Sequence, residues 1–201
     1  MADMDKALPN VETELKIPND EEVALAEQSL AEEQVGPEDI DVTQEEDGGA
    51  TINFDPAAVI NSCSTNNGLF FKLNNNEALI LKTPITTFAN TVTAVNSPRT
   101  VLINSDNQVI YRSFSSTINS SYFCGTLPPA NPTVIEEWYA SNGILGTSGL
   151  IQVTTTQIID PTTNAVTGYN HYVVFKNITF SNGRSSFTYE NYVYGNYVTV
   201  P

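Results

Sequence analysis

The pattern of apolar and polar positions divides the chain near residue 55. From residue 56 onward, short runs rich in Val, Ile, Tyr, Phe and Thr alternate with clusters of Asn, Asp, Ser, Gly and Pro. Such runs fit a pleated, half-buried surface, and the clusters between them supply turns. We therefore expect strands at 69–73, 78–82, 100–104, 108–114, 134–139, 150–159, 169–180 and 185–194, with a last short strand at 197–200.

Turn chemistry supports these boundaries. The pair Asn182-Gly183 is typical of a tight hairpin because both residue types tolerate a positive φ. Asp106-Asn107 predicts a second hairpin, between 100–104 and 108–114. Three consecutive Asn at 74–76 predict a turn, and 160–164 predicts a longer loop between two long strands. This order of elements favours an antiparallel meander.

The periodicity within the strands indicates how they are covered. Residues 151–154 alternate between apolar and polar types, which predicts a strand with one wet face, whereas 172–175 are apolar on both faces. A strand of the second kind is expected to be central and covered on both sides. Two packed antiparallel sheets satisfy both observations. We therefore predict an all-β domain, an antiparallel β-sandwich over 56–201, with a small open barrel as the alternative.

Charge separates residues 1–55 from the rest. This segment carries 17 acidic residues and two lysines, a net charge of −15, whereas six acidic and six basic residues balance one another from residue 56 onward. With one aromatic residue and few aliphatic ones, it predicts a largely disordered acidic leader outside the core. Asn19 or Asp20 can cap a helix at 20–34. The leader is then either a solvated tail or a docking arm for a basic or apolar groove.

Several partners and compartments are disfavoured by the same features. We expect no nucleic-acid partner, because the chain has no basic patch to neutralise phosphates. No run of about 18 apolar residues is present, so we expect no direct membrane insertion. The first residues lack the basic and apolar regions of a secretory signal, and the sequence therefore contains no visible export signal.

The residues that carry chemistry are few. Cys63 and Cys124, the only thiols, can close a disulfide in an oxidising compartment or remain as two buried free thiols. Two Cys and the single His cannot form a tetrahedral zinc site at these spacings. No phosphate loop, nucleotide fingerprint or calcium loop is present. We therefore expect no metal and no cofactor.

The candidate catalytic residues do not combine into a site, and we expect no enzyme. His171 lies within an apolar strand, which favours a histidine that points outward or is hydrogen-bonded in place. Glu136 and Glu137 are adjacent in a strand, so they point to opposite faces and cannot form one acid and base pair. Glu137 is expected to share a face with Tyr139.

Aromatic residues near the end of the chain supply a candidate binding surface. Tyrosine offers a large rigid contact area with a polar tip, which suits glycan and protein partners. Ordinary cross-strand packing between aromatic rings is the alternative. The surface is predicted from Tyr189, Tyr192, Tyr194 and Tyr197, together with Trp138.

Longer sequence blocks resemble a known family. These blocks are "LFFKLNNNEALIL", "PRTVLINSDNQVIYR", "CGTLPPANPTVIEEW" and "TGYNHYVVFKNITF", followed by "YENYVYGNYVT". Over 63–201 they resemble uncharacterised cell-envelope lipoproteins of flavobacterial type. The resemblance implies a β-rich domain located in the periplasm or at the cell surface, in which Cys63 and Cys124 match internal cysteines. It carries no catalytic residues over to this chain.

The start of the chain resembles something else. The blocks "MADMDKALPNVETELKIPND" and "EEDGGATINFDPAA" are similar, over 1–57, to the acidic N-terminus of tailed-phage portal proteins. That resemblance implies, as the alternative function, a virion structural protein that docks through its leader. Two dissimilar pieces that meet near 56–61 indicate a chimera, which arises from a natural fusion, an acquired tail or a join in sequence assembly. If the first strands of the β-domain were lost, part of its core or of a sheet edge would be uncovered.

Overall fold

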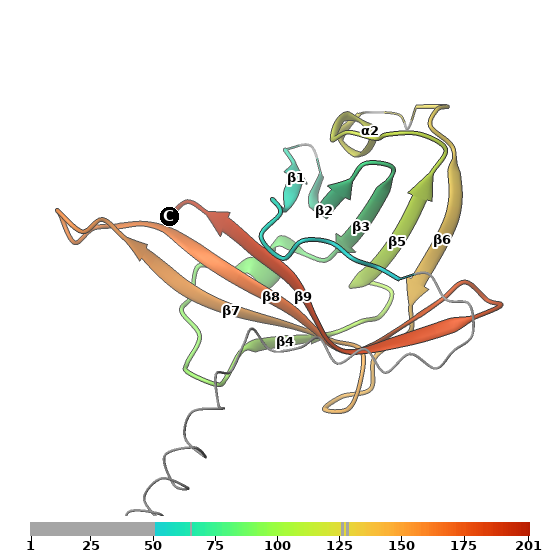
Figure 1. Cartoon of the computed structure of the whole chain (residues 1–201). Helices are drawn as coiled ribbons and strands as arrows, with labels where there is room; N and C mark the ends of the chain where they lie inside the picture. The colour runs from blue at the N-terminus through green and yellow to red at the C-terminus, as the bar shows by residue number, and fades with distance from the viewer. Residues whose placement is uncertain (1–50, 65, 126, 128) are drawn as a thin grey trace, which may run out of the picture. The chain divides into compact units, whose positions relative to one another are not determined.

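The computed structural model describes residues 51–64, 66–125, 127 and 129–201 and consists mainly of antiparallel strands (Figure 1). The predicted all-β class is therefore confirmed. The acidic stretch 1–50 and the predicted helix at 20–34 lie outside the described residues. The elements are β1 (Asn61–Cys63), β2 (Asn66–Asn74), β3 (Glu77–Lys82), the 3₁₀ helix η1 (Ile85–Phe88), β4 (Arg99–Leu102), β5 (Gln108–Phe114), the short helix α2 (Ser121–Cys124), β6 (Val134–Ala140), β7 (Leu150–Ile159), β8 (Val166–Ser181) and β9 (Ser186–Thr199).

Hydrogen bonds link the strands into one continuous sheet instead of the two separate sheets that we predicted. The order is β1-β2-β3-β5-β6-β8-β7-β4, and β9 pairs with β8. Strand β8 joins the two parts, since most of its length pairs with β7 while Phe180 and Ser181 pair with β6. We call β1, β2, β3, β5 and β6 the first wing, and β4, β7, β8 and β9 the second wing.

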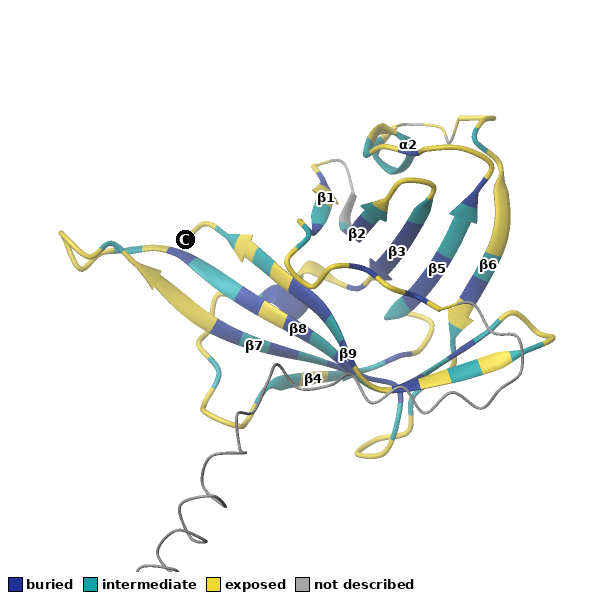
Figure 2. Cartoon of the chain, viewed as in Figure 1, coloured by how far each residue is buried: buried dark blue, intermediate teal, exposed yellow. Residues whose placement is uncertain are grey.

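The two wings face each other across the main core. Residues of β2, β3 and β5 on one side, and of β7, β8 and β9 on the other, belong to a single buried cluster. Figure 2 shows these stretches of strand as buried. The hydroxyl of Tyr194 in β9 donates a hydrogen bond to the backbone carbonyl of Leu79 in β3, at 3.3 Å, which joins the wings directly.

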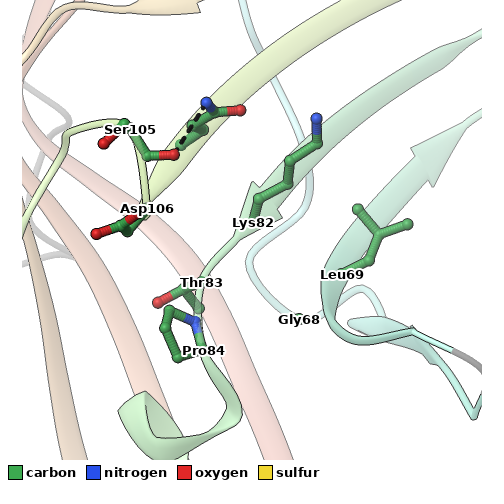
Figure 3. Close-up of a pocket in the computed structure, with 8 residues that line it drawn as sticks. Gly68, Leu69, Lys82, Thr83, Pro84, Ser105 and Asp106 are labelled. Atoms are coloured by element: carbon green, nitrogen blue, oxygen red, sulfur yellow. Dashed lines mark hydrogen bonds between the residues drawn. The ribbon is translucent and has the colours of Figure 1, made fainter.

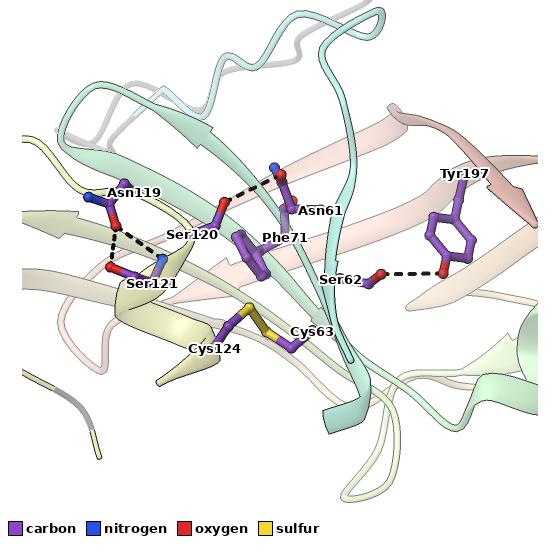
Figure 4. The surroundings of a disulfide bond; sticks show 9 residues. All are labelled: Asn61, Ser62, Cys63, Phe71, Asn119, Ser120, Ser121, Cys124 and Tyr197. Atoms are coloured by element: carbon purple, nitrogen blue, oxygen red, sulfur yellow. Dashed lines mark hydrogen bonds between the residues drawn. A yellow bond between two sulfur atoms is a disulfide. The ribbon is translucent and has the colours of Figure 1, made fainter. Parts of the chain in front are cut away.

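The opposite face of the first wing has a smaller core of its own. Phe71, Ile80, Ile110 and Phe114 are buried there beneath α2. A disulfide joins Cys63 of β1 to Cys124 at the end of α2, with the two Cα atoms 5.3 Å apart. Figure 4 shows Phe71 beside this bond. The disulfide therefore attaches α2 to the sheet, and α2 covers the apolar face of that sheet.

The turns agree with the sequence at three positions. Asn75 has a φ of 52° between β2 and β3, and Gly183 has a φ of 84° between β8 and β9. In the second turn the side-chain oxygen of Asn182 accepts hydrogen bonds from the amides of Arg184 and Ser185, each at 2.9 Å. The 160–164 loop joins β7 to β8 as predicted.

The predicted hairpin at Asp106-Asn107 is wrong. A turn does form there, because the Asn104 side-chain oxygen accepts hydrogen bonds from the Asp106 and Asn107 amides. The strands on either side nevertheless diverge. Strand β4 pairs with β7 in the second wing, and β5 pairs with β3 and β6 in the first. The turn therefore carries the chain from one wing to the other.

The last two predicted strands form one strand, β9. Gly195 lies at a bulge between them, with a φ of 123°, and pairing with β8 continues on both sides of it. The bulge keeps the pairing intact while one extra residue enters β9.

The expectation that β8 is covered on both faces is also wrong, because the Tyr172 side chain on its outer face is 38% exposed.

Residues 51–56, which we call the strap, belong to the core of the β-domain. The side chains of Ile52 and Phe54 are buried in the main core, whereas Thr51, Asn53 and Asp55 between them are exposed. The predicted boundary at residue 55 therefore falls too late in the chain. Acidic composition placed these residues in the leader, but two apolar side chains in alternation suffice to bury one edge of an extended segment.

Candidate functional site

The residues of the predicted tyrosine surface are not exposed. Tyr189, Tyr192, Tyr194 and Trp138 are all buried, and Tyr197 is half-buried. Their rings contact other core aromatics, such as Phe175 at 5.1 Å from Tyr194 between ring centroids. The prediction of an exposed binding platform from these residues is therefore wrong. Cross-strand packing, the alternative, accounts for their positions.

Two of these tyrosines instead hold the backbone of the strap. The Tyr189 hydroxyl accepts a hydrogen bond from the Ile52 amide at 2.9 Å and lies 3.3 Å from the Ile52 carbonyl, to which it donates. The Tyr192 hydroxyl accepts from the Phe54 amide at 3.3 Å. Burial raises the pKa of both phenols. Both therefore remain neutral in the physiological range, as donation of a hydroxyl proton requires.

A buried lysine completes the attachment of the strap. Lys72 in β2 is 0% exposed, and its Nζ donates to the carbonyl oxygens of Asp55 at 2.7 Å and Pro56 at 3.1 Å. Burial disfavours the ammonium and lowers the pKa of Lys72 to about 8, although the Asp55 carboxylate partly opposes this effect. The ammonium also lies 5.8 Å from the centroid of the Tyr194 ring, a cation–π contact.

Gly195 leaves the space that this arrangement needs. A Cβ at this position would lie 2.6 Å from the Pro56 carbonyl oxygen and 2.8 Å from Lys72 Nζ. The burial of Lys72 was not predicted from the sequence, in which it counts only as one of the six bases that balance six acids from residue 56 onward. The available signal was its spacing: Lys72 is two positions from Phe70 and so points to the same inner face.

A small cavity and an open depression flank the core. The cavity, about 180 Å³, lies between the strap and β9 beside Tyr189 and Tyr192. The depression, about 500 Å³, has both polar and apolar lining residues, and Figure 3 shows Lys82 between Asp106 and Leu69. Among its lining residues, the Gln108 side chain donates to the Ser105 carbonyl at 3.2 Å, and the Thr83 amide donates to the Gly68 carbonyl at 3.0 Å. Its lining is Gly68, Leu69, Lys82, Thr83, Pro84, Ser105, Asp106 and Gln108.

Six uncharged residues form part of the outer face of the second wing, and we call this part the Tyr172 face. It consists of two rows of residues paired across β7, β8 and β9. All six residues are exposed or half-buried, and the Asn170 amide donates to the Asn196 side-chain oxygen at 2.9 Å. The rows are Thr154, Tyr172 and Asn196, and then Thr156, Asn170 and Val198.

His171 is hydrogen-bonded in place inside the second wing. Its Nδ1 lies 2.9 Å from the Thr155 hydroxyl and its Nε2 lies 3.0 Å from the Thr199 hydroxyl. Arg99 donates to the Thr155 oxygen at 3.5 Å, and Thr199 donates to Asn90 at 2.5 Å. The hydrogen bonds that lead from Arg99 to Asn90 can all be donated in the same direction when His171 is neutral and carries its proton on Nε2.

Burial lowers the pKa of His171 to about 4, and the nearby Arg99 guanidinium acts in the same direction. The unfolded chain therefore binds one more proton than the folded chain between about pH 6.5 and pH 4. As the pH is lowered from about 6.5 to 4, we expect the free energy of unfolding to decrease by about 3 kcal/mol because of this residue alone.

The measurement is urea unfolding at several pH values for the wild type and for His171→Gln. The variant should lose less stability on acidification, since it has no imidazole to protonate. Parallel pH dependences for the two proteins would show that His171 is not the group responsible.

The paired carboxylates behave as their strand positions predict. Glu137 forms an ion pair with Arg112 and accepts a hydrogen bond from the Tyr139 hydroxyl on the same face. Glu136 is exposed and points away from that group. Trp138, between them in β6, is buried, and its Nε1 is the one buried side-chain polar atom without a partner among the described residues.

No group of three or more His, Cys, Asp or Glu side chains in the described part of the chain could hold a metal ion. No helix in the same residues is long and apolar enough to cross a bilayer. Comparisons of the chain with protein-family models, curated proteins and solved structures found no match.

Proposed function

We propose that this chain is a non-catalytic module of the cell envelope that binds a glycan on the Tyr172 face. The observation that carries the proposal is the row Thr154–Tyr172–Asn196, in which an exposed aromatic ring stands in register between a hydroxyl and an amide. Neighbouring Asn170 and Thr156 extend the same chemistry to a second row.

Sugars present both apolar C–H surfaces and hydroxyl groups. An aromatic ring covers the former, and amide and hydroxyl side chains can donate to and accept from the latter. The Tyr172 face carries no charged residue, which favours a neutral glycan over an acidic one. Its backbone belongs to a paired strand ladder, so the side chains are held on a rigid support.

The envelope location is supported by two independent features. The Cys63–Cys124 disulfide suits an oxidising compartment, such as a periplasm or a cell surface. The sequence blocks over 63–201 resemble envelope lipoproteins. Against catalysis stands the position of His171, whose two ring nitrogens both contact threonine hydroxyls.

The test is binding of full-length protein to an array of neutral bacterial and plant glycans. Tyr172→Ala should weaken the binding of any captured glycan about tenfold, the loss expected for one stacked ring of roughly 1–1.5 kcal/mol. Tyr139→Ala is the matched control, because Tyr139 is 48% exposed on the other wing. Equal binding by wild type and Tyr172→Ala, or no captured glycan at all, would refute the proposal.

A further inference from the structure

The strap is held in a way that differs from every strand of the domain. It belongs to no strand ladder, and the backbone of Ile52, Phe54, Asp55 and Pro56 is bound by side chains of the rest of the domain. Three side chains make these contacts: Tyr189 with Ile52, Tyr192 with Phe54, and Lys72 with the carbonyls of Asp55 and Pro56. The strap can therefore leave without breaking any backbone pairing in the sheet.

The recognised features are those of a short extended peptide. Side chains that bind backbone amides and carbonyls do not depend on the identity of the residue that carries them. Specificity comes from the two apolar side chains at alternate positions, Ile52 and Phe54, which enter the main core. We call the site formed by Lys72, Tyr189, Tyr192 and Gly195 the strap cleft.

The connection between the strap and β1 is suited to act as a hinge. Residues 57–60 contain no strand, and the Val59 side chain is 75% exposed. The hydrogen bonds of Ala57 and Ala58 lead back to Asp55 within the strap itself, at 2.8 and 2.9 Å. Rotation about the backbone near Val59 would therefore move the strap as a unit.

We propose that the strap cleft also accepts the strap of a second copy of this chain, so that two molecules exchange straps and form a symmetric dimer. The occupant is this segment because it is the peptide that the cleft fits, and every copy carries both the segment and the cleft. In the exchanged dimer each strap cleft holds the strap of the other molecule, so both clefts are occupied in the same way, as two-fold symmetry requires. The intramolecular strap dominates in dilute solution and exchange grows with protein concentration.

The experiment uses the full chain with a protease site inserted between Ala58 and Val59. After cleavage, the fragment that carries the strap should stay bound to the rest of the protein. A fluorescent peptide of residues 49–58 should then displace it. The matched control peptide carries Ile52→Ser and Phe54→Ser, has the same charge, and should bind roughly a hundredfold more weakly because two buried apolar side chains are lost.

The uncut protein supplies the second part of the test. Two differently tagged populations, mixed and concentrated, should give heterodimers by native mass spectrometry, and Ile52→Ser/Phe54→Ser chains should give none. Peptide binding without heterodimers would restrict the cleft to the chain's own strap and overturn the exchange. Equal binding of both peptides, or unfolding of the cleaved protein in circular dichroism, would overturn the strap cleft as a peptide site.

Discussion

Replacing Phe54 with alanine should lower the free energy of unfolding by about 3–5 kcal/mol, the usual cost of removing a buried phenylalanine ring. The ring is 4% exposed in the main core, although it also lines the cavity of about 180 Å³. That cavity means the ring is not fully surrounded, so we expect a value near the lower end. Urea unfolding can be followed by the fluorescence of the single tryptophan, Trp138.

Asn53→Ala is the matched control for this experiment. Asn53 is the neighbour of Phe54 on the exposed side of the strap, and replacing it should change stability by less than about 0.5 kcal/mol. If 1–55 were an independent leader, as its charge predicts, both substitutions would be neutral. A Phe54→Ala protein as stable as the wild type would therefore restore the boundary at residue 55.

Removing the disulfide should cost about 4 kcal/mol, the chain-entropy value for a loop that spans 61 positions. The double variant Cys63→Ala/Cys124→Ala avoids placing a hydroxyl in the buried position of Cys63. Without the bond, α2 packs on the sheet through half-buried side chains such as Tyr122 and Phe123. We therefore expect it to loosen first, which uncovers the smaller core.

The measurements are urea unfolding and dye binding to exposed apolar surface, each with oxidised wild type, reduced wild type and the double variant. Reduced wild type should match the variant and not the oxidised protein. Two free thiols in air-oxidised wild type, or a variant within about 1 kcal/mol of the wild type, would count against this role of the disulfide.

The sequence was informative where the structure is decided locally. The Asn182-Gly183 hairpin, the turn at 74–76 and most strand positions follow from residues within a few positions of one another. The placement of β4 does not, because its pairing with β7 depends on residues about 50 positions away. A turn sequence alone cannot tell whether the strands that flank it pair with each other.

The candidate site depended on contacts that are distant in the sequence. Tyr189 lies 137 positions from Ile52, and nothing near either residue indicates that they meet. The single-residue bulge at Gly195 determines which tyrosines of β9 point inward, and one residue of register reverses the face of every side chain beyond it. His171 was different, because a polar residue within an apolar strand already predicts a hydrogen-bonded position.

The strap also bears on how the two dissimilar parts of the chain are joined. Ile52 and Phe54 come from the acidic side of the junction, yet they fill the core of the β-domain. Figure 1 shows this segment running between the two wings toward β1. Residues on both sides of position 56 therefore contribute to one folded unit.

Amide hydrogen exchange at Ile52 and Phe54 in the full-length protein tests the central claim most directly, because these two amides donate to the Tyr189 and Tyr192 hydroxyls. We predict that both exchange slowly, at rates closer to those of β8 than to those of an unfolded peptide, and that Tyr189→Phe accelerates exchange at Ile52. Exchange of both amides at the unprotected rate in the wild type, with β8 still protected, would show that the strap is not part of the fold.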